Sequence, residues 1–593
     1  MSTSEIKAIL FDLGNVLIKI DFSRVISEWV RFSGKDNIQI SSDSILGSEN
    51  EKYERGEIST QQFVSSLKRE LKLNISDEKF LQGWNNVFVG ETPGIRNVID
   101  RVFSKYPLFV FSNTSISHSN VWRSQYSELL KYFDKIFTSY ELGMRKPEKE
   151  SFFKVLIIIL ISASFFVGYF LRENAAGGGA EFFKLSWPII QSFEKDFLYT
   201  INNYALFGDG TIPFSHIINA YINPFSNNVT SLQLSNTVIS FFIFFIFALI
   251  LKKIFSSISN VNILLISSVI LLLPFFRTSA FWGKNENYGW LFFILALYFF
   301  FEIKKTISKI PNNKDILNVV FFCLTSSCAL YARQALIFLP ISYLLYLFIN
   351  NANKKIIIVS IISFFILSIP GLLLIFTWSD IYDTKNTLLP IGFNKDWLHP
   401  KYILINTPII LSFFGFYLLP ILMIEFLDSG FKVFFDKYFK SFALALIVFM
   451  FFSQIDLLDY LGKYTKGGGA ILKLNYLIQK NNFFLLLIFS SIGFSVLIRL
   501  FKENTKNNMV IILPMLLIYC FTHLLYQEYV EPLILIIFFL TLKTNLHKIY
   551  FKNISTSHII FLTYFAIYLI GSIYFKHFAF KTYEEWKIFL GAL

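Results

Sequence analysis

The sequence predicts two regions of different fold class: an α/β segment over residues 1–150 and an all-α polytopic membrane domain over residues 151–593. Mean hydropathy is +0.52 and only 16% of residues are charged, whereas soluble domains have about a quarter of their residues charged. Most of the chain is therefore expected to lie in lipid. The net charge of +13 comes from lysines scattered between apolar runs, which favours anionic lipid as a partner and argues against nucleic acid.

Short apolar runs in the first 150 residues alternate with amphipathic stretches. Residues 8–11 and 108–111 have the composition of buried strands, and residues 22–32 and 61–73 have helical periodicity. Strands separated by helices predict a parallel sheet.

Polar side chains follow these predicted strands. Asp12 comes directly after the first, Ser112 and Asn113 follow the second, and Lys146 lies further along the chain. The carboxyl ends of parallel strands face the ligand crevice of α/β folds. A nucleophilic carboxylate, groups that hold phosphoryl oxygens and a neutralising lysine form a set suited to phosphoryl transfer.

The motifs FDLGNV (11–16), YERGEIS (53–59), SNT (112–114) and GMRKPE (143–148) carry a resemblance. Residues 5–150 resemble sugar phosphatases of the haloacid dehalogenase (HAD) superfamily that act on α-D-glucose 1-phosphate. The resemblance implies a Rossmann-like core with a helical cap and a Mg²⁺ cofactor. It also implies Asp12 as nucleophile and metal ligand, Ser112 and Asn113 as phosphate ligands, and Lys146 as charge stabiliser.

The family's last acidic motif, which holds Mg²⁺, is missing after Lys146, where the first apolar span begins. Asp380 and Asp383 are expected across the membrane from Asp12 and would not replace it. We therefore expect an incomplete, inactive phosphatase segment, either a relic or a fusion product joined near residues 149–154. A membrane-tethered sugar phosphatase is the alternative.

About thirteen uncharged runs are long enough to cross a bilayer. They cover residues 155–171, 236–251, 261–276, 288–303, 316–332, 334–350, 356–377, 403–426, 441–455, 482–498, 508–525, 529–542 and 557–575. The lysine-rich short loops fall on one side, which the positive-inside rule assigns to the cytoplasm. The N-terminal segment is then cytoplasmic, and a bacterial inner membrane is the predicted location.

A long exterior loop follows the first predicted span and carries Asp196 and Asp209. With more than ten spans, this layout resembles the GT-C class of glycosyltransferases, which take sugars from polyprenyl phosphate carriers. The resemblance implies a loop carboxylate as catalytic base, Asp196 first and Asp209 second, because the acceptor hydroxyl must lose a proton. A solvated loop without catalytic role is the alternative for both.

Cationic residues at span ends are candidate ligands of the carrier phosphate. Arg277 follows one predicted span, with Glu286 close behind, and Arg333 with Gln334 interrupts an apolar run. Arginine can bind phosphate bidentately, and polar groups within membrane segments are usually functional. Simple placement at the lipid interface is the alternative for these arginines.

Two carboxylates, Glu528 and Glu531, fall in a short exterior turn, either as acceptor or metal contacts or as the polar cap of a hairpin. The predicted function is transfer of a sugar from a lipid-linked donor, with the acceptor unidentified and no cofactor identified for the membrane domain. A transporter or flippase is a further alternative, although no internal repeat of the transporter kind is visible.

Overall fold

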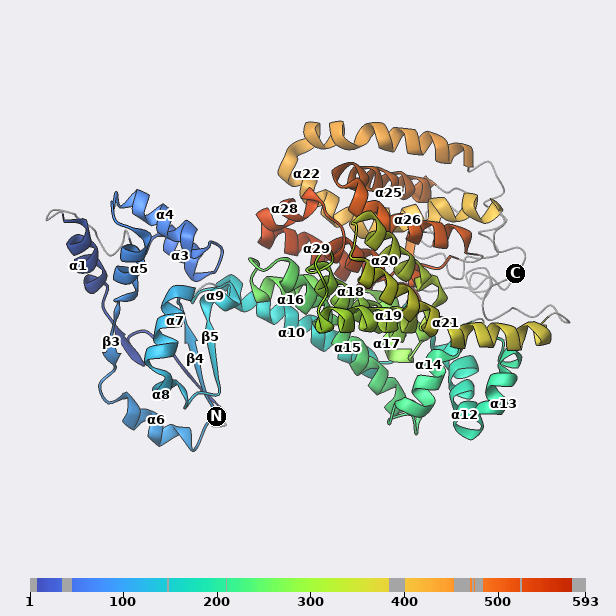
Figure 1. Ribbon diagram of the computed structural model, residues 1–593, viewed down its shortest axis with the longest axis horizontal. Coiled ribbons are helices and arrows are strands. Elements are labelled where there is room, and N and C mark those ends of the chain that lie inside the picture. The colour runs from blue at the N-terminus through green and yellow to red at the C-terminus, as the bar shows by residue number, and fades with distance from the viewer. Residues whose placement is uncertain are drawn as a thin grey trace. The chain divides into compact units, whose positions relative to one another are not determined.

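The computed structural model describes residues 8–34, 45–146, 149–209, 211–382, 400–452, 470–471, 474, 484–522 and 525–578. It divides into two compact units (Figure 1). The first contains residues 1–160 with residues 251–266, and the second contains residues 161–250 with residues 267–593.

A three-stranded parallel sheet lies at the centre of the first unit. Strands β1 (Ile9–Phe11), β4 (Leu108–Ser112) and β5 (Lys135–Thr138) are ordered β1-β4-β5. Helices α6 (Ile95–Phe103), α7 (Ile116–Gln125), α8 (Ser127–Leu130) and α9 (Ser139–Leu142) connect or follow the strands. Buried side chains of Val110, Ile99 and Trp122 pack in its core. The predicted α/β fold is confirmed for this unit.

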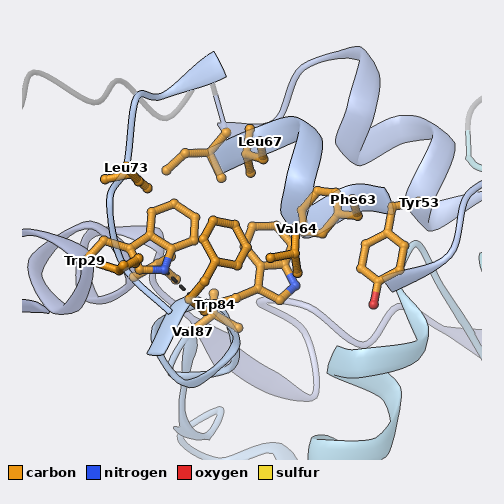
Figure 2. Packing of buried hydrophobic residues seen from close by; sticks show 12 residues of the cluster. Trp29, Tyr53, Phe63, Val64, Leu67, Leu73, Trp84 and Val87 are labelled. Carbon is orange, nitrogen blue, oxygen red and sulfur yellow. Dashed lines mark hydrogen bonds between the residues drawn. The ribbon is translucent and has the colours of Figure 1, made fainter. Parts of the chain in front are cut away.

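A helical layer is inserted between the antiparallel strands β2 (Ile18–Ile20) and β3 (Phe88–Glu91). Its helices are α1 (Phe22–Ser33), α3 (Ser48–Glu54), α4 (Thr60–Glu70) and α5 (Asp77–Asn85). Figure 2 shows part of their aromatic core, including Trp29, Phe63 and Trp84. Trp29 stacks on Phe80 at 4.5 Å and donates its indole N–H to the Phe80 carbonyl at 2.9 Å. Phe63 and Trp84 complete this buried cluster. The tight aromatic packing holds the insert together as one layer.

His118 of α7 is buried against this layer, and we predict that it makes the first unit sensitive to acid. Its ring stacks on Trp84 at 4.5 Å and its Nε2 donates to the Trp84 carbonyl at 3.0 Å. Burial lowers the pKa of His118 from 6.5 to about 4. The unfolded chain therefore binds the proton first, and about 3 kcal/mol of stability is lost as pH falls from 6.5 to 4.

Hydrogen exchange of peptides covering α5 and α7 in the full-length protein would measure this loss. His118→Phe retains the stacked ring but removes the titrating group, so its exchange protection should vary less over the same pH range. Equal acid sensitivity in both proteins would contradict the assignment.

Long apolar helices dominate the second unit, and two of them, α10 and α15, have residues in both units. They are α10 (Lys149–Phe170), α15 (Val229–Ile254), α18 (Asn285–Lys304), α19 (Asn313–Ala332), α21 (Lys354–Tyr382), α22 (Pro400–Phe452), α25 (Phe484–Glu503) and α29 (Ile554–His577). Within the described residues, these eight helices are long and apolar enough to cross a membrane. The composition and helix lengths indicate a membrane protein.

Two further apolar segments are sharply bent. Asn260–Leu272 meets α17 (Pro274–Trp282) at 71°, and Gln527–Leu540 meets α28 (Asn545–Lys552) at 87°. The first bend follows from Leu273, whose backbone is extended before Pro274, because a residue preceding proline disfavours the helical region. The second segment contains α27 (Leu533–Leu540). Both fall on predicted spans, 261–276 and 529–542, which are therefore parts of broken elements.

The predicted count of about thirteen spans is not confirmed. Predicted span 403–426 and the described part of predicted span 441–455, residues 441–452, both fall in α22, where Gly430 (φ 77°, ψ 165°) breaks the helical backbone. Predicted spans 334–350 and 508–525 correspond to the shorter apolar helices Gln334–Ile349 and α26 (Thr505–Phe521). Composition identifies apolar runs, but it does not reveal which runs are straight and which are bent.

Short helices fill the predicted exterior loop. They include α11 (Gly179–Glu181), α12 (Trp187–Lys195), α13 (Phe197–Asn202) and α14 (Phe214–Ile217). Ile189, Phe193 and Tyr204 form their buried core. The loop is thus a packed layer that fixes the position of its acidic residues.

Candidate functional site

In the first unit, three of the four predicted phosphate-site residues are in contact. Asp12 Oδ2 lies 2.9 Å from Lys146 Nζ. Asn113 Nδ2 donates to the Lys146 carbonyl at 2.8 Å, and Asn113 Oδ1 accepts from the Lys146 backbone N–H at 2.7 Å. Lys146 Nζ also donates to the Phe111 carbonyl at 2.5 Å. The carboxyl ends of β1 and β4 therefore place a carboxylate beside a fixed ammonium group.

Ser112, the fourth predicted residue, is buried at the end of β4, and its hydroxyl lies 3.5 Å from the Asn113 carbonyl. Asp12 is half exposed. The carboxylate of Asp12 is thus accessible to a ligand, whereas the Ser112 hydroxyl is covered in this arrangement.

Arg145 ties the loop that carries Lys146 to the helical layer. Its guanidinium contacts Glu54 at 2.7 Å and Glu51 at 2.9 Å, both on α3. Burial raises the pKa of Glu54 even though Arg145 opposes this shift. The pairing fixes the loop position, as a shared polar contact between two layers does.

The donors at this site do not fit a preformed Mg²⁺ site. Among the described residues, no group of three or more His, Cys, Asp or Glu side chains is placed to hold a metal ion. Asp12 is the predicted metal ligand, and its carboxylate is already paired with Lys146. Asp383 and the side chain of Asp380, weighed earlier as substitutes, lie outside the described residues. Helix α10 begins three residues after Lys146, so no acidic strand end follows there.

In the second unit, five charged residues from separate segments form what we call the charged cluster: Glu181, Lys284, Glu286, Arg333 and Glu528. Glu286 Oε1 lies 2.9 Å from Arg333 Nη2, and Lys284 Nζ lies 3.0 Å from Glu181 and 2.9 Å from Glu528. Lys284 and Glu286 flank the start of α18, and Arg333 ends α19. The cluster therefore joins the ends of two long helices to two shorter segments.

Burial makes this cluster unlike a surface ion-pair network. Glu286 is 3% exposed, whereas Glu181 is 51% exposed and forms the open side. Burial alone would lower the pKa of Lys284, but Glu528, Glu286 and Glu181 together raise it well above its usual value. Lys284 is thus held as a cation.

One acceptor in the cluster has no protein partner. Glu286 Oε2 is buried and forms no hydrogen bond in the described part of the chain. Three carboxylates accompany two cations here, so the cluster does not neutralise itself. A buried carboxylate oxygen without a donor is costly, which indicates that a hydroxyl or water completes the site.

Asp209 is linked to the cluster through its neighbours. Its Oδ2 lies 2.9 Å from His216 Nε2, and its Oδ1 accepts from Thr211 N and Oγ1 at 2.9 and 2.8 Å. Asn285, the residue before Glu286, donates to Thr211 Oγ1 at 2.8 Å. Burial raises the pKa of Asp209, but these hydrogen bonds outweigh it and lower the pKa overall. Asp209 is therefore a buried anion with filled acceptors.

Asp196 lies in a different environment. Its Oδ1 accepts from the Tyr199 backbone N–H at 2.9 Å, which caps α13, and the residue is exposed. Gln334 begins the turn after Arg333 and is half buried. Asp196 thus performs a local structural role whether or not it also takes part in chemistry.

Arg277, predicted to bind the carrier phosphate, is instead buried and paired with a carboxylate of the protein. It is 2% exposed and donates to both carboxylate oxygens of Glu173, with its Nη2 2.6 Å from Glu173 Oε2. It also donates to the Ser164 and Leu271 carbonyls. The guanidinium is therefore saturated by the protein.

The two carboxylates of the predicted exterior turn have separate partners. Glu528 belongs to the charged cluster, while Glu531 Oε1 accepts from the backbone N–H groups of Phe275 and Phe276 at 2.7 and 3.3 Å. Glu531 thereby caps α17 and joins the two bent segments. Glu173 and Glu181 were missed as partners, although both flank the glycine-rich run after the first span.

The known proteins to which this chain is similar match only about a quarter of it. No family model matches it. A D-ribitol-5-phosphate phosphatase of Bacteroides thetaiotaomicron is 26% identical over 157 residues, which cover 25% of this chain and 74% of that protein. The N-terminal region resembles HAD-family phosphatases. The predicted substrate branch, α-D-glucose 1-phosphate, is not confirmed.

Solved structures give likenesses of the same extent. An HAD-family enzyme of Bacteroides thetaiotaomicron is 26% identical, with 26% of this chain and 77% of that chain covered and a TM-score of 0.24. A variant of that enzyme, in complex with magnesium and inorganic phosphate, is 25% identical over the same shares with a TM-score of 0.23. A predicted HAD-like hydrolase of Porphyromonas gingivalis is 23% identical, covers 26% and 76%, and has a TM-score of 0.22.

Proposed function

We propose that residues 151–593 form a GT-C type membrane glycosyltransferase, which moves a sugar from a polyprenyl phosphate carrier to an extracytoplasmic acceptor. The observation that carries this proposal is the unpartnered Glu286 Oε2 beside Arg333 and Lys284. Inverting sugar transfer needs a carboxylate that accepts the acceptor's proton and cations that stabilise the departing phosphate. The charged cluster supplies both kinds of group.

Glu286 is our preferred base, and Asp196 stays the alternative predicted from the sequence. The free oxygen of Glu286 is placed to accept a hydroxyl proton, while its other oxygen is held by Arg333. Lys284 is paired with Glu181, which lies on the open side of the cluster. A lipid phosphate entering there can replace Glu181 as the partner of Lys284, because Glu181 is 51% exposed and forms the open side of the cluster.

Release of polyprenyl phosphate tests the proposal. The purified full-length protein is incubated with polyprenyl phosphate sugars of several hexoses and pentoses, and the freed carrier is measured by mass spectrometry. Donor-dependent release that is lost in Glu286→Gln or Asp196→Asn supports a transferase. Movement of the intact lipid-linked sugar across liposomes without release would instead support the transporter or flippase alternative.

The membrane and its orientation remain part of the proposal. We propose a bacterial inner membrane with the N-terminal segment in the cytoplasm, because the short lysine-rich loops fall on that side. Reporter tags after residues 305 and 335 should then report opposite faces. If both tags report the same face, the predicted orientation is wrong, and the charged cluster would not face the extracytoplasmic acceptor. That result would contradict the transferase proposal.

A tethered sugar phosphatase is the second candidate, favoured by the Asp12–Lys146 contact and the HAD resemblance. Solved structures of an HAD relative contain magnesium, and Mg²⁺ is the cofactor we propose if the segment is active. Mg²⁺ is usually held by one or two carboxylates plus the substrate phosphate, but the carboxylate of Asp12 is already paired with Lys146. Metal binding should therefore be weak.

We expect no hydrolysis of α-D-glucose 1-phosphate or D-ribitol 5-phosphate above background in millimolar Mg²⁺. The reason is that, among the described residues, no group of three or more His, Cys, Asp or Glu side chains could hold the metal ion beside Asp12. Phosphate release by the wild-type protein and by Asp12→Asn should be equal. Turnover that Asp12→Asn abolishes would show that the shortened segment is a working phosphatase.

A further inference from the structure

A half-open cavity lies between the helices of the second unit, away from the residues of the charged cluster, and its empty space of about 510 Å³ includes the part that opens to the surroundings. Helices α18, α19, α20 (Phe338–Ile349) and α26 provide most of its wall, and they lie together in the membrane domain (Figure 1). Its lining is mainly aliphatic and aromatic, including Leu297, Phe322 and Leu339. Small-molecule sites commonly have this apolar character.

Two lysines, Lys304 and Lys543, lie at the cavity. Among the described residues, neither ammonium group forms an ion pair. Lys304 Nζ instead lies 5.3 Å from the ring centre of Phe301 and 6.0 Å from that of Phe300. The neighbouring Lys305, by contrast, is 61% exposed and pairs with Glu302 at 3.0 Å.

Lys543 is held at the bend between α27 and α28 by its backbone. Asn508 donates to the Lys543 carbonyl at 3.0 Å and accepts from the Lys543 N–H at 2.8 Å. Lys304 and Lys543 line the same cavity. Two like charges held together beside an apolar cavity favour an anion that bridges them.

A third polar group in the cavity also lacks a partner. Ser342 lines it, is 4% exposed, and its Oγ forms no hydrogen bond in the part of the chain that the structure describes. Buried hydroxyls are usually hydrogen-bonded. An ester or hydroxyl of a bound molecule would satisfy it.

We propose that this cavity binds an anionic phospholipid of the surrounding membrane, with the phosphate at Lys304 and Lys543 and an acyl chain along the apolar wall. A free phosphate would leave that wall unused, so the combination of cations and apolar lining selects an amphiphile. This inference does not rest on the proposed transferase.

The cavity and the charged cluster lie at opposite ends of α18. Glu286 and Lys304 are 18 residues apart on this helix, which corresponds to about 27 Å at 1.5 Å per residue. This is close to the thickness of the hydrocarbon core. The phospholipid site therefore belongs to the face predicted to be cytoplasmic, where lysines meet anionic headgroups.

Native mass spectrometry of the full-length protein titrated with dioleoyl phosphatidylglycerol or dioleoyl phosphatidylcholine tests the proposal. We expect one retained phosphatidylglycerol and no equivalent phosphatidylcholine. The double variant Lys304→Gln/Lys543→Gln should bind it about 30-fold more weakly, because each lysine near a headgroup contributes about a fivefold change. Lys305→Gln is the matched control and should bind as the wild type does.

Several outcomes would overturn the proposal. Equal binding by the double variant, or equal weakening by Lys305→Gln, would remove the lysine pair from the site. Displacement by millimolar inorganic phosphate would indicate a soluble anion, and preferential binding of a polyprenyl monophosphate would indicate the carrier lipid.

A measurement on the unmodified protein covers the case in which the double variant does not fold. Phosphatidylglycerol with a diazirine in its acyl chain should crosslink to peptides of α18, α20 and α26. Crosslinks confined to other helices would exclude the cavity.

Discussion

Replacing Arg277 by leucine is expected to lower the free energy of unfolding by about 3–5 kcal/mol, because it leaves the Glu173 carboxylate buried without its partner. Both side chains are almost fully enclosed, and the guanidinium donates to both carboxylate oxygens. It also satisfies the carbonyls of Ser164 and Leu271. One substitution therefore disturbs contacts between two segments, 164–173 and 271–277, that are about a hundred residues apart in sequence.

Thermal unfolding in detergent, followed by tryptophan fluorescence and size exclusion, measures this effect. Arg172→Leu is a matched control, since Arg172 is exposed and adjacent to Glu173. The double variant Arg277→Leu/Glu173→Leu should recover most of the loss, because it removes both charges. A single variant as stable as the control would show that the pair is not buried in the membrane.

The α/β segment was predictable because its signals are local. Asp12 and Asn113 come directly after apolar runs, and parallel strands bring such positions to one edge, where Lys146 joins them. The burial of Ser112 was not predictable, since the sequence does not show which side of a strand end is covered. The prediction that the last acidic motif is missing rests on the change to an apolar composition after Lys146.

The membrane spans were only partly predictable from the same kind of signal. An apolar run indicates that a segment lies in lipid. Whether the helix there is straight or bent depends on single residues. Leu273 before Pro274 bends one run, and Gly430 breaks another. The sequence contains these residues, but other prolines such as Pro370 and Pro514 lie inside helices, so proline alone does not identify a bend.

Within the candidate transferase site, the ion-pair partners of the predicted cations were the hardest feature to predict. Glu286 and Arg333 were both identified as polar residues at span ends, and the structure pairs them. Glu173 and Glu181 were missed because their partners Arg277 and Lys284 are about a hundred residues away in sequence. Distant pairing depends on helix packing, which composition and periodicity do not encode.

The largest effect on activity is expected for Glu286→Gln, which should reduce the turnover number for sugar transfer by about 10²–10⁴-fold. Glutamine has nearly the same shape, so it retains the contact with Arg333 but has no basic oxygen for the acceptor's proton. The cations remain in place, so KM for the lipid-linked donor should be unchanged or lower. A fall in kcat without a rise in KM separates lost chemistry from lost binding.

Asp196→Asn separates the two candidate bases without disturbing the fold. Asparagine is as good an N-cap as aspartate, so α13 should retain its first hydrogen bond while the carboxylate is lost. If Glu286 is the base, this variant transfers sugar at nearly the wild-type rate. If Asp196 is the base, Asp196→Asn loses sugar transfer and Glu286→Gln transfers sugar at nearly the wild-type rate. Glu302→Gln, at the other end of α18, controls for the loss of a carboxylate on the same helix. Full activity of all three variants would show that the charged cluster has no catalytic role.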